Sequence, residues 1–520
     1  MNHKTPTPVW RLGALAAGLT LALALPAAAV TLRIANQGDA LSMDPHSLNE
    51  SLQITVVENV YEPLIWRDDK FKLTPVLATS WKQTAPTVWR FELRKGVTFH
   101  DGTPFTADDV IFSYERAKGD GSDMKTYVGQ IKEIKKLSDH SIDIITNQPF
   151  PILPEMITHW NIMSKKWCEE NQATKPVDRR KGIENAASFR ANGTGPFRLR
   201  ERQPGVRTTF TRNGSYWGKI PTNVDEVIFT PIGNDATRVA AMLSGEVDVM
   251  EPVPVQDVER IKANAKLNVL QGPELRVIFL GMDQARDELL YSNVKGKNPF
   301  KDKRVRQAFY QAIDIETIKS RVMRGAATPT ALMLTSQING YAADLAKRLP
   351  YDPEASKKLL AEAGYPNGLD FEIPVSTVEG VWPAMAEVFQ QQVAAAGFRA
   401  KIVQVPSDGY FNEIWMKRPV SMTRWNQRPA DSALNEIYRT GATWNEGFYK
   451  DAKFDVMLDE ARKELNFDKR KAKYQQAQEH LWETSGTLVG FHATLTVATT
   501  ARVKNLDAVE NFTIRWNRIT

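Results

Sequence analysis

The sequence predicts an α/β protein with more than one packed unit, and three observations support this. The chain has 520 residues, 42% of them hydrophobic and 25% charged, which is ordinary globular composition but too long for one core. Residues 224–249 are patterned as strand, helix and strand, with Gly245 ending the helix. Residues 371–405 repeat this order. The first series predicts one βαβ unit with a right-handed crossover in a mostly parallel sheet.

The N-terminus has the pattern of a secretory signal peptide. Lys4 and Arg11 precede an apolar run over residues 12–25, and Ala27-Ala28-Ala29 offers a small-residue cleavage site. We expect residues 1–29 to be removed, with cleavage after Ala29. The run is shorter than a membrane-spanning helix needs, and no cysteine stands at the cleavage point to accept a lipid. The sequence therefore predicts an exported protein without an anchor, most simply in the periplasm of a Gram-negative bacterium.

Charge and cysteine content exclude several classes of protein. The formal net charge is +6, and basic residues are interleaved with acidic ones without long runs of one sign, which argues against a nucleic-acid partner. Cys168 is the single cysteine, so no disulfide can form within the chain.

Residues 77–117 give the clearest local pattern in the chain. Trp89, Phe91 and Leu93 alternate with charged residues, which predicts a strand with one buried face. Two glycine turn signals follow. Thr106 and Asp109 then form a capping box that opens a helix. Taken by itself, this stretch indicates a structural role only, and its side chains are expected to pack against neighbouring elements rather than to carry chemistry.

The amino-acid sequence of this stretch is more specific than its hydrophobic pattern. It reads W-x-F-x-L-R-x-G-V-x-F-H-D-G and then P-F-T-A-x-D-V-x-F-S, and residues 59–64 read NVYEPL within a predicted helix over 56–65. In these features the chain resembles the extracytoplasmic solute-binding proteins of dipeptide, oligopeptide and nickel ABC importers. The resemblance covers essentially the whole mature chain. It implies a two-lobed periplasmic-binding-protein clamshell with an extra subdomain in the first lobe.

The resemblance also implies a division of the chain. Residues 30–273 and 490–520 are expected to form the first lobe, with the subdomain at about 59–190, and residues 274–489 the second. The two chain crossings of the hinge are expected near Pro273 to Leu275 and Leu488 to Phe491. The loop over residues 38–45, which includes Met43, is expected at the rim of the cleft.

Several second-lobe elements follow from local signals. Residues 275–282 form a continuous apolar run suited to a strand buried on both faces. Residues 299–318 are patterned as a helix, and Asp352-Pro353 opens another that stops at Gly364. Two further helices are predicted near residues 453–465 and 470–483.

No pattern in the sequence indicates catalysis, a cofactor or a metal site. None of the seven histidines has a second His or Cys at ligand spacing, and G-x-S-x-G, H-E-x-x-H and Walker motifs are all missing. We therefore expect no enzyme, although an exported hydrolase with scattered catalytic residues remains the alternative from another class.

Candidate ligand-binding residues gather in the second lobe, where tryptophans stand close to polar side chains. Rigid aromatic walls can bury apolar parts of a solute, and charged groups can pair with its ends. Together with Met43 at the rim, the candidates are Trp382, Arg424, Trp425, Asn426, Arg428, Asp431, Trp444 and Asn445.

Asp431 is the candidate contact for a ligand amine. In the peptide-binding members of the resembled family, an Asp in a loop of the form W-x-x-x-x-D-P-D pairs with the peptide amino terminus. Here the loop reads W-N-Q-R-P-A-D, without Asp-Pro, and Asp431 is its only acid. This role predicts that Asp431→Asn weakens an amine-bearing ligand at least about a hundredfold and leaves the thermal stability of the unliganded protein nearly unchanged.

The leading functional hypothesis is the solute-binding component of an ABC importer. It captures a peptide or peptide-like solute between two lobes, acts as a monomer, and delivers the solute to the membrane permease by hinge motion. An opine, a sugar-like solute, a nickel chelate or haem carried by the same fold remain alternatives.

Overall fold

The computed structural model describes residues 1, 3, 29–68, 72–272, 276–336, 338–406, 410–485, 488–506 and 514–520. The expected signal peptide and the crossing expected at Pro273 to Leu275 lie outside these residues, apart from Met1, His3 and Ala29. Among the described helices, none combines the length and apolar character that crossing a membrane requires.

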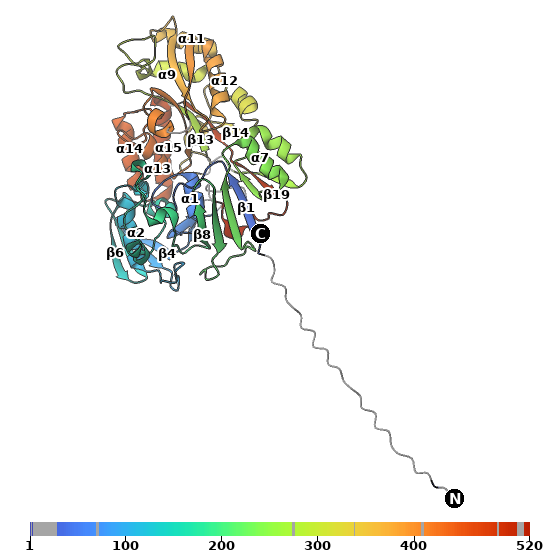
Figure 1. Ribbon diagram of the computed structural model, residues 1–520. Helices are drawn as coiled ribbons and strands as arrows, with labels where there is room; N and C mark the ends of the chain where they lie inside the picture. The colour runs from blue at the N-terminus through green and yellow to red at the C-terminus, as the bar shows by residue number, and fades with distance from the viewer. Residues whose placement is uncertain are drawn as a thin grey trace.

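The first lobe is built on a seven-stranded sheet. In spatial order its strands are β12 (Leu267–Gln271), β19 (Thr496–Thr500), β11 (Val249–Glu251), β1 (Thr31–Asn36), β10 (Glu226–Pro231), β9 (Arg207–Arg212) and β8 (Phe197–Gln203). The C-terminal strand β19 therefore lies in the same sheet as β1 (Figure 1). Helices of this lobe are α1 (Ser51–Val57), α7 (Asp235–Ser244) and α8 (Val258–Lys262).

The predicted βαβ unit is present, but the sheet is mixed. β10, α7 and β11 follow one another, and β10 and β11 both pair in parallel with β1 between them. The remaining pairings in the sheet are antiparallel. The expectation of a mostly parallel sheet was wrong because β8 and β9 form a hairpin on one side, while β12 and β19 add two antiparallel strands on the other.

The predicted helix over residues 56–65 is also wrong, because α1 ends at Val57. Beyond it, backbone groups bond to a distant segment: the Val60 carbonyl accepts from the Gly195 amide at 2.9 Å, and the Asn59 carbonyl from the Phe197 amide at 3.1 Å. Pro63 has no N–H to continue a helix.

A subdomain follows with its own antiparallel sheet in the order β4 (Ala78–Ala85), β5 (Val88–Leu93), β7 (Ser141–Thr146) and β6 (Ile131–Ser138). The capping box is confirmed: the Thr106 amide donates to Asp109 at 2.9 Å, and α2 (Ala107–Lys118) begins there. Phe91 and Leu93 are buried as predicted. The other elements here are β2 (Ile65–Arg67), β3 (Leu73–Pro75), α3 (Lys125–Val128), α4 (Leu153–Met156), α5 (Lys165–Glu170) and α6 (Ala186–Phe189).

The second lobe contains a four-stranded sheet and a parallel pair. The sheet order is β14 (Ala327–Pro329), β18 (Leu488–Ala493), β13 (Arg276–Met282) and β17 (Val420–Asn426), and β15 (Leu369–Val375) pairs with β16 (Phe398–Gln404). Strand β13 is buried on both faces, as its apolar run predicts. Ile278 and Leu280 belong to one hydrophobic core, and Val277 and Phe279 to another.

Helices cover both cores of this lobe (Figure 1). They are α9 (Lys303–Gln311), α10 (Ile315–Thr317), α11 (Pro353–Glu362), α12 (Trp382–Ala394), α13 (Ala430–Ile437), α14 (Ala452–Lys463) and α15 (Phe467–Thr484). The Asp352 cap is confirmed, since its carboxylate accepts from the Ala355 amide at 2.8 Å. The long helix expected over 299–318 is interrupted by a second cap at Asp314.

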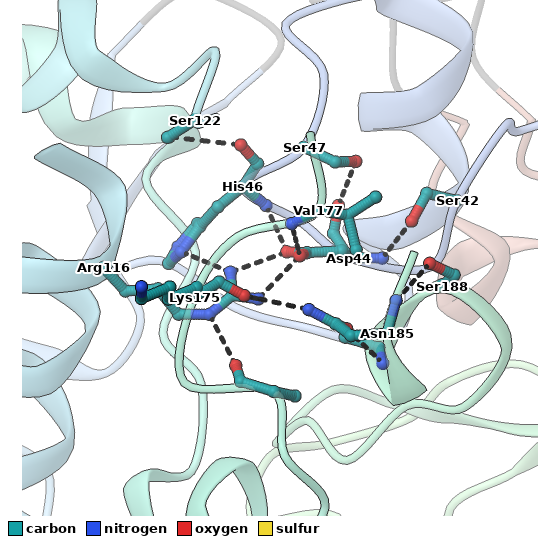
Figure 2. A network of polar contacts seen from close by, with 12 residues as sticks. Ser42, Asp44, His46, Ser47, Arg116, Ser122, Lys175, Val177, Asn185 and Ser188 are labelled. Carbon is teal, nitrogen blue, oxygen red and sulfur yellow. Dashed lines mark hydrogen bonds and ion pairs between the residues drawn. The ribbon is translucent and has the colours of Figure 1, made fainter. Parts of the chain in front are cut away.

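The loop over residues 38–45 is fixed by a buried ion pair (Figure 2). Both carboxylate oxygens of Asp44 accept from the Arg116 guanidinium, at 2.7 and 2.6 Å, and both side chains are fully buried. Burial favours a raised pKa for Asp44, but the Arg116 charge outweighs it and lowers this pKa. The pair ties the loop to helix α2, so loop and subdomain are held as one body.

Candidate functional site

A cavity of about 250 Å³ lies between the two lobes, and we call it the interlobe cavity. From the first lobe and its subdomain, its lining comprises the start of α1 and the segments around β2, α3 and α4. From the second lobe, it comprises the end of β17 and the turn after it. The lining residues are Asn49, Glu50, Ser51, Ile54, Arg67, Tyr127, Glu155, Thr158, His159, Phe411, Trp415, Thr423, Arg424, Trp425, Asn426, Gln427, Arg428 and Pro429.

Indole rings in tilted contact form one wall of this cavity. Trp425, at the end of β17, lies with its ring 6.3 Å from that of Trp415 and 5.5 Å from that of Trp444. Both Trp415 and Trp425 donate their indole N–H to the buried carboxylate of Glu446, at 2.9 and 2.6 Å. Because their only polar atoms are bound behind the wall, these rings are held in place and present apolar surface.

Glu446 is an unusual support for this wall because no cation pairs with it among the described residues. Burial raises its pKa from an ordinary 4.5 to about 7, although the Trp425, Trp415 and Thr423 hydrogen bonds favour the charged form. Between pH 4.5 and about 7, the folded protein therefore keeps a proton on Glu446 that the unfolded chain has released.

This proton gives a testable pH dependence. Since the folded pKa is the higher one, the stability linked to Glu446 is complete below pH 4.5 and is lost as the pH rises to about 7. The difference in unfolding free energy between the native protein and Glu446→Gln should fall by roughly 2 to 3 kcal/mol between pH 4.5 and 8. Urea unfolding of both proteins at several pH values measures this, and a constant difference would contradict it.

Two arginines beside the wall share one carboxylate. Arg424 forms an ion pair with Glu379, and Arg276 lies 3.4 Å from the same carboxylate. The Arg276 Nε also donates to the Asn426 side-chain oxygen at 3.2 Å. Burial lowers the pKa of Arg276, and the neighbouring Arg424 charge adds to this effect. Glu251 and Glu50 also lie close enough to Arg276 to favour its charged form, so acidic and basic groups are gathered together beside the cavity.

Direct contacts between the lobes close this region. The Asn426 amide donates to the Ser51 hydroxyl at the start of α1. Glu436 accepts from Thr126 of the subdomain and forms an ion pair with Arg428. The conformation is therefore one in which the lobes touch around the cavity.

Two charged groups at the cavity have no ion-pair partner within the described parts of the chain. Arg67 donates from one Nη to the Glu155 carbonyl at 2.8 Å, and burial lowers its pKa. Glu50 is exposed and accepts from the Gln53 amide at 3.0 Å, as the cap of α1. A guanidinium and a carboxylate in one cavity can bind opposite charges of one solute.

The comparisons with known proteins agree with this architecture. The family model of bacterial extracellular solute-binding proteins, family 5, matches residues 72–446. The chain belongs to this family. As a family 5 protein, it is the solute-binding component of an ABC importer.

Relatives of this family 5 protein have different ligands in their names. The glutathione-binding protein GsiB of Pectobacterium atrosepticum is 27% identical over 484 residues, 90% of each chain. The Helicobacter pylori protein DppA, solved with the peptide STSA, is 25% identical with a TM-score of 0.80, over 94% of this chain and 97% of that one. Campylobacter jejuni NikZ, solved with Ni(L-His), is 21% identical with a TM-score of 0.81, over 94% and 99% of the two chains, and shows the shared fold.

The structure divides the residues expected to bind ligand. Arg424, Trp425, Asn426 and Arg428 line the interlobe cavity, whereas Trp444 is not among the lining residues and packs its ring 5.5 Å from that of Trp425. The polar side chains among them already have protein partners. Arg424 pairs with Glu379, Asn426 donates to Ser51, and Arg428 pairs with Glu436. Of this group, Trp425 offers the surface most available to a solute.

We do not retain the amine-binding role of Asp431. Its side chain is 1% exposed, and its carboxylate accepts from Arg462 at 2.8 Å and from the Tyr474 hydroxyl at 2.8 Å. It is not among the residues lining the cavity. An ion pair inside the second lobe therefore occupies the carboxylate that was expected to bind an amine.

Three further candidates are core residues. Trp382 is fully buried with its ring 5.3 Å from that of Tyr410, and Met43 is fully buried in the first lobe. Asn445 accepts from the Tyr449 amide at 2.9 Å and donates to its carbonyl at 2.7 Å, so it holds a turn. These side chains were expected in the cleft because aromatic and amide residues suit both cores and binding sites.

Sequence reasoning also missed functional candidates. Glu50 of the first lobe and Arg67 of its subdomain lie across the cavity from the second lobe, 375 and 358 residues before Trp425 in the chain, and no local motif marks them. Among the described residues, no group of three or more His, Cys, Asp or Glu is placed to hold a metal ion.

Proposed function

We propose that this protein captures a short peptide or peptide-like solute in the interlobe cavity. The observation that carries the proposal is the combination of a fixed apolar wall at Trp425 with an unpaired guanidinium at Arg67 and an unpaired carboxylate at Glu50. A zwitterion with an apolar side chain matches all three. The small volume, about 250 Å³, favours a short peptide over a long one.

We assign a role to each of these groups. Arg67 pairs with the solute carboxylate, because a half-buried guanidinium without an ion-pair partner gains from binding an anion. Glu50 pairs with the solute amine at the edge of the cavity. Trp425 covers the apolar part. The glutathione and peptide named for two relatives carry both charges, which supports this choice over a neutral solute.

The proposal includes the cellular setting. The protein works as a monomer in the periplasm, after cleavage behind Ala29, and passes its solute to an ABC permease by hinge motion between the two lobes, with β18 in the second lobe and β19 in the first. The Val30 amide lies 2.9 Å from the Asp225 carboxylate. Cleavage after Ala29 would turn this amide into an ammonium group beside that carboxylate.

Titration calorimetry with end-blocked peptides tests these roles. For a tripeptide panel including glutathione, Arg67→Gln should weaken binding of free-carboxylate peptides about 30- to 100-fold and change binding of their C-terminal amides little. Glu50→Gln should weaken free-amine peptides about tenfold and leave N-acetyl peptides unchanged, since Glu50 is exposed. Trp425→Ala should weaken every binder.

Arg190→Gln provides the matched control, because Arg190 is an exposed first-lobe arginine outside the cavity lining. It should bind like the native protein. Equal affinity of Arg67→Gln for acid and amide forms, each as tight as native, would remove Arg67 from the site. If no peptide binds the native protein, the peptide proposal fails and the metal-chelate and opine panels take its place.

A further inference from the structure

His159 lines the interlobe cavity from the subdomain, at the end of the short 3-10 helix η1 (Ile157–His159). Its side chain is 22% exposed. Two contacts fix the ring: Nδ1 lies 2.7 Å from Oε1 of Glu58, and the ring of Tyr127 packs edge-on with its centroid 5.9 Å away. The imidazole is therefore held in one orientation before a solute arrives.

The other ring nitrogen of His159, Nε2, is accessible and available to a solute. It has no hydrogen-bond partner among the described residues, and it is not one of the buried side-chain atoms that lack a partner. Nδ1 turns toward Glu58, whose side chain is fully buried. Nε2 lies on the opposite side of the ring, so it is the nitrogen that His159 presents to the cavity.

Glu58 determines which ring nitrogen carries the hydrogen. A carboxylate can only accept hydrogen bonds, so Nδ1 must donate to it. In the neutral ring, Nε2 then has the lone pair and is an acceptor. Glu58 also forms an ion pair with Arg515 at 3.0 Å. Because Arg515 already balances the charge of Glu58, a neutral His159 leaves no charge of this network unpaired.

This acceptor lies on the same wall of the cavity as the guanidinium that we assign to the solute carboxylate. Arg67 donates to the Glu155 carbonyl at 2.8 Å, and the Thr158 hydroxyl donates to the same carbonyl at 3.2 Å. Thr158 directly precedes His159, and both line the cavity. In a peptide, the N–H and the carboxylate of the last residue are attached to the same Cα. One solute residue can therefore place its carboxylate on Arg67 and its N–H on His159.

We propose that Nε2 of His159 accepts the N–H of the solute's carboxy-terminal residue. The inference rests on the proposed function and deepens it, because it makes the last peptide bond part of what the protein recognises. The solute class is then a peptide with a free N–H on its last residue, and peptides that end in proline lack this donor. His159 is a specificity-determining residue, and Glu58 is a positioning residue that acts through it.

An exchange of amide for ester tests this contact, because the ester oxygen keeps the shape of the peptide and removes the hydrogen. Titration calorimetry on the full mature protein compares the tripeptide Ala-Leu-Ala with the analogue in which an oxygen atom replaces the last N–H. The native protein should bind this ester about tenfold more weakly. His159→Phe, which keeps a ring against Tyr127, should bind the tripeptide about tenfold more weakly than the native protein does and should no longer distinguish it from the ester.

His140→Phe is the matched control, because His140 is a subdomain histidine outside the cavity lining, and it should keep the native preference for the amide. Equal affinity of the native protein for amide and ester would overturn the inference, and this comparison needs no variant that must fold. A native preference for the amide in His159→Phe would overturn it as well. Both results leave the roles of Arg67 and Glu50 standing, since end-blocked peptides test those separately. If the native protein binds no peptide at all, the proposed function fails and this inference fails with it.

Discussion

Replacing Asp431 by asparagine should lower the free energy of unfolding by about 3 to 5 kcal/mol and leave solute affinity within about threefold of native. The carboxylate is 1% exposed and faces Arg462, whose side chain is 13% exposed. Burial favours a lower pKa for Arg462, but the Asp431 charge outweighs it and raises this pKa. Without that charge, a buried guanidinium keeps its charge and loses its partner.

Urea unfolding and calorimetric binding on the same preparation measure the two effects. Asp459→Asn is the matched control, because Asp459 pairs with Arg439 in the same lobe at 2.8 Å but both side chains are about one-third exposed. Its cost should be roughly 0 to 1 kcal/mol. A hundredfold loss of affinity with native stability in Asp431→Asn would restore the amine contact expected from the sequence.

The contrast at Asp431 shows where sequence reasoning fails. The loop W-N-Q-R-P-A-D marks the residues around Trp425 correctly, since five of its seven residues line the interlobe cavity. It gives no information on Arg462 and Tyr474, which reach Asp431 from α14 and α15, 31 and 43 residues later. A carboxylate expected to meet a ligand and one that meets a distant arginine look the same in sequence.

More of the fold than of the site could be predicted from the sequence, because helix caps, glycine stops and apolar runs are local sequence features. Caps at Thr106 and Asp352, the glycine stop at Gly245 and the apolar run of β13 each depend on a few neighbouring residues, and all appear as predicted. The direction of the strands is not local. The edge strand β12 pairs with β19, more than 200 residues away, and no pattern in either strand specifies that partner.

The Glu50 and Arg67 positions illustrate the same limit for the site. Each is an ordinary charged residue within its segment, and what distinguishes them is the absence of an ion-pair partner among the described residues around a cavity. That property depends on every neighbour in space, so only the folded arrangement reveals it.

Replacing Asp44 by alanine should destabilise the protein by about 3 to 5 kcal/mol, the other large effect that we expect. Asp44 accepts four hydrogen bonds through its carboxylate: two from Arg116, one from the His46 amide at 2.9 Å and one from the Val177 amide at 2.8 Å (Figure 2). Arg116 is fully buried, so its charge cannot be solvated when the carboxylate is removed.

The destabilisation should depend on the burial of the ion pair, so a variant that removes an exposed ion pair should show little of it. Glu115→Gln is the control, because the neighbouring residue pairs with Lys118 at 2.7 Å on the same helix with both side chains about half exposed, and it should cost roughly 0 to 0.5 kcal/mol. Since Asp44 joins the loop over residues 38–45 to the subdomain, hydrogen exchange should also accelerate at the His46 and Val177 amides. Equal stability of Asp44→Ala and Glu115→Gln would mean that water reaches Arg116, and that the loop and α2 are not held together by this pair.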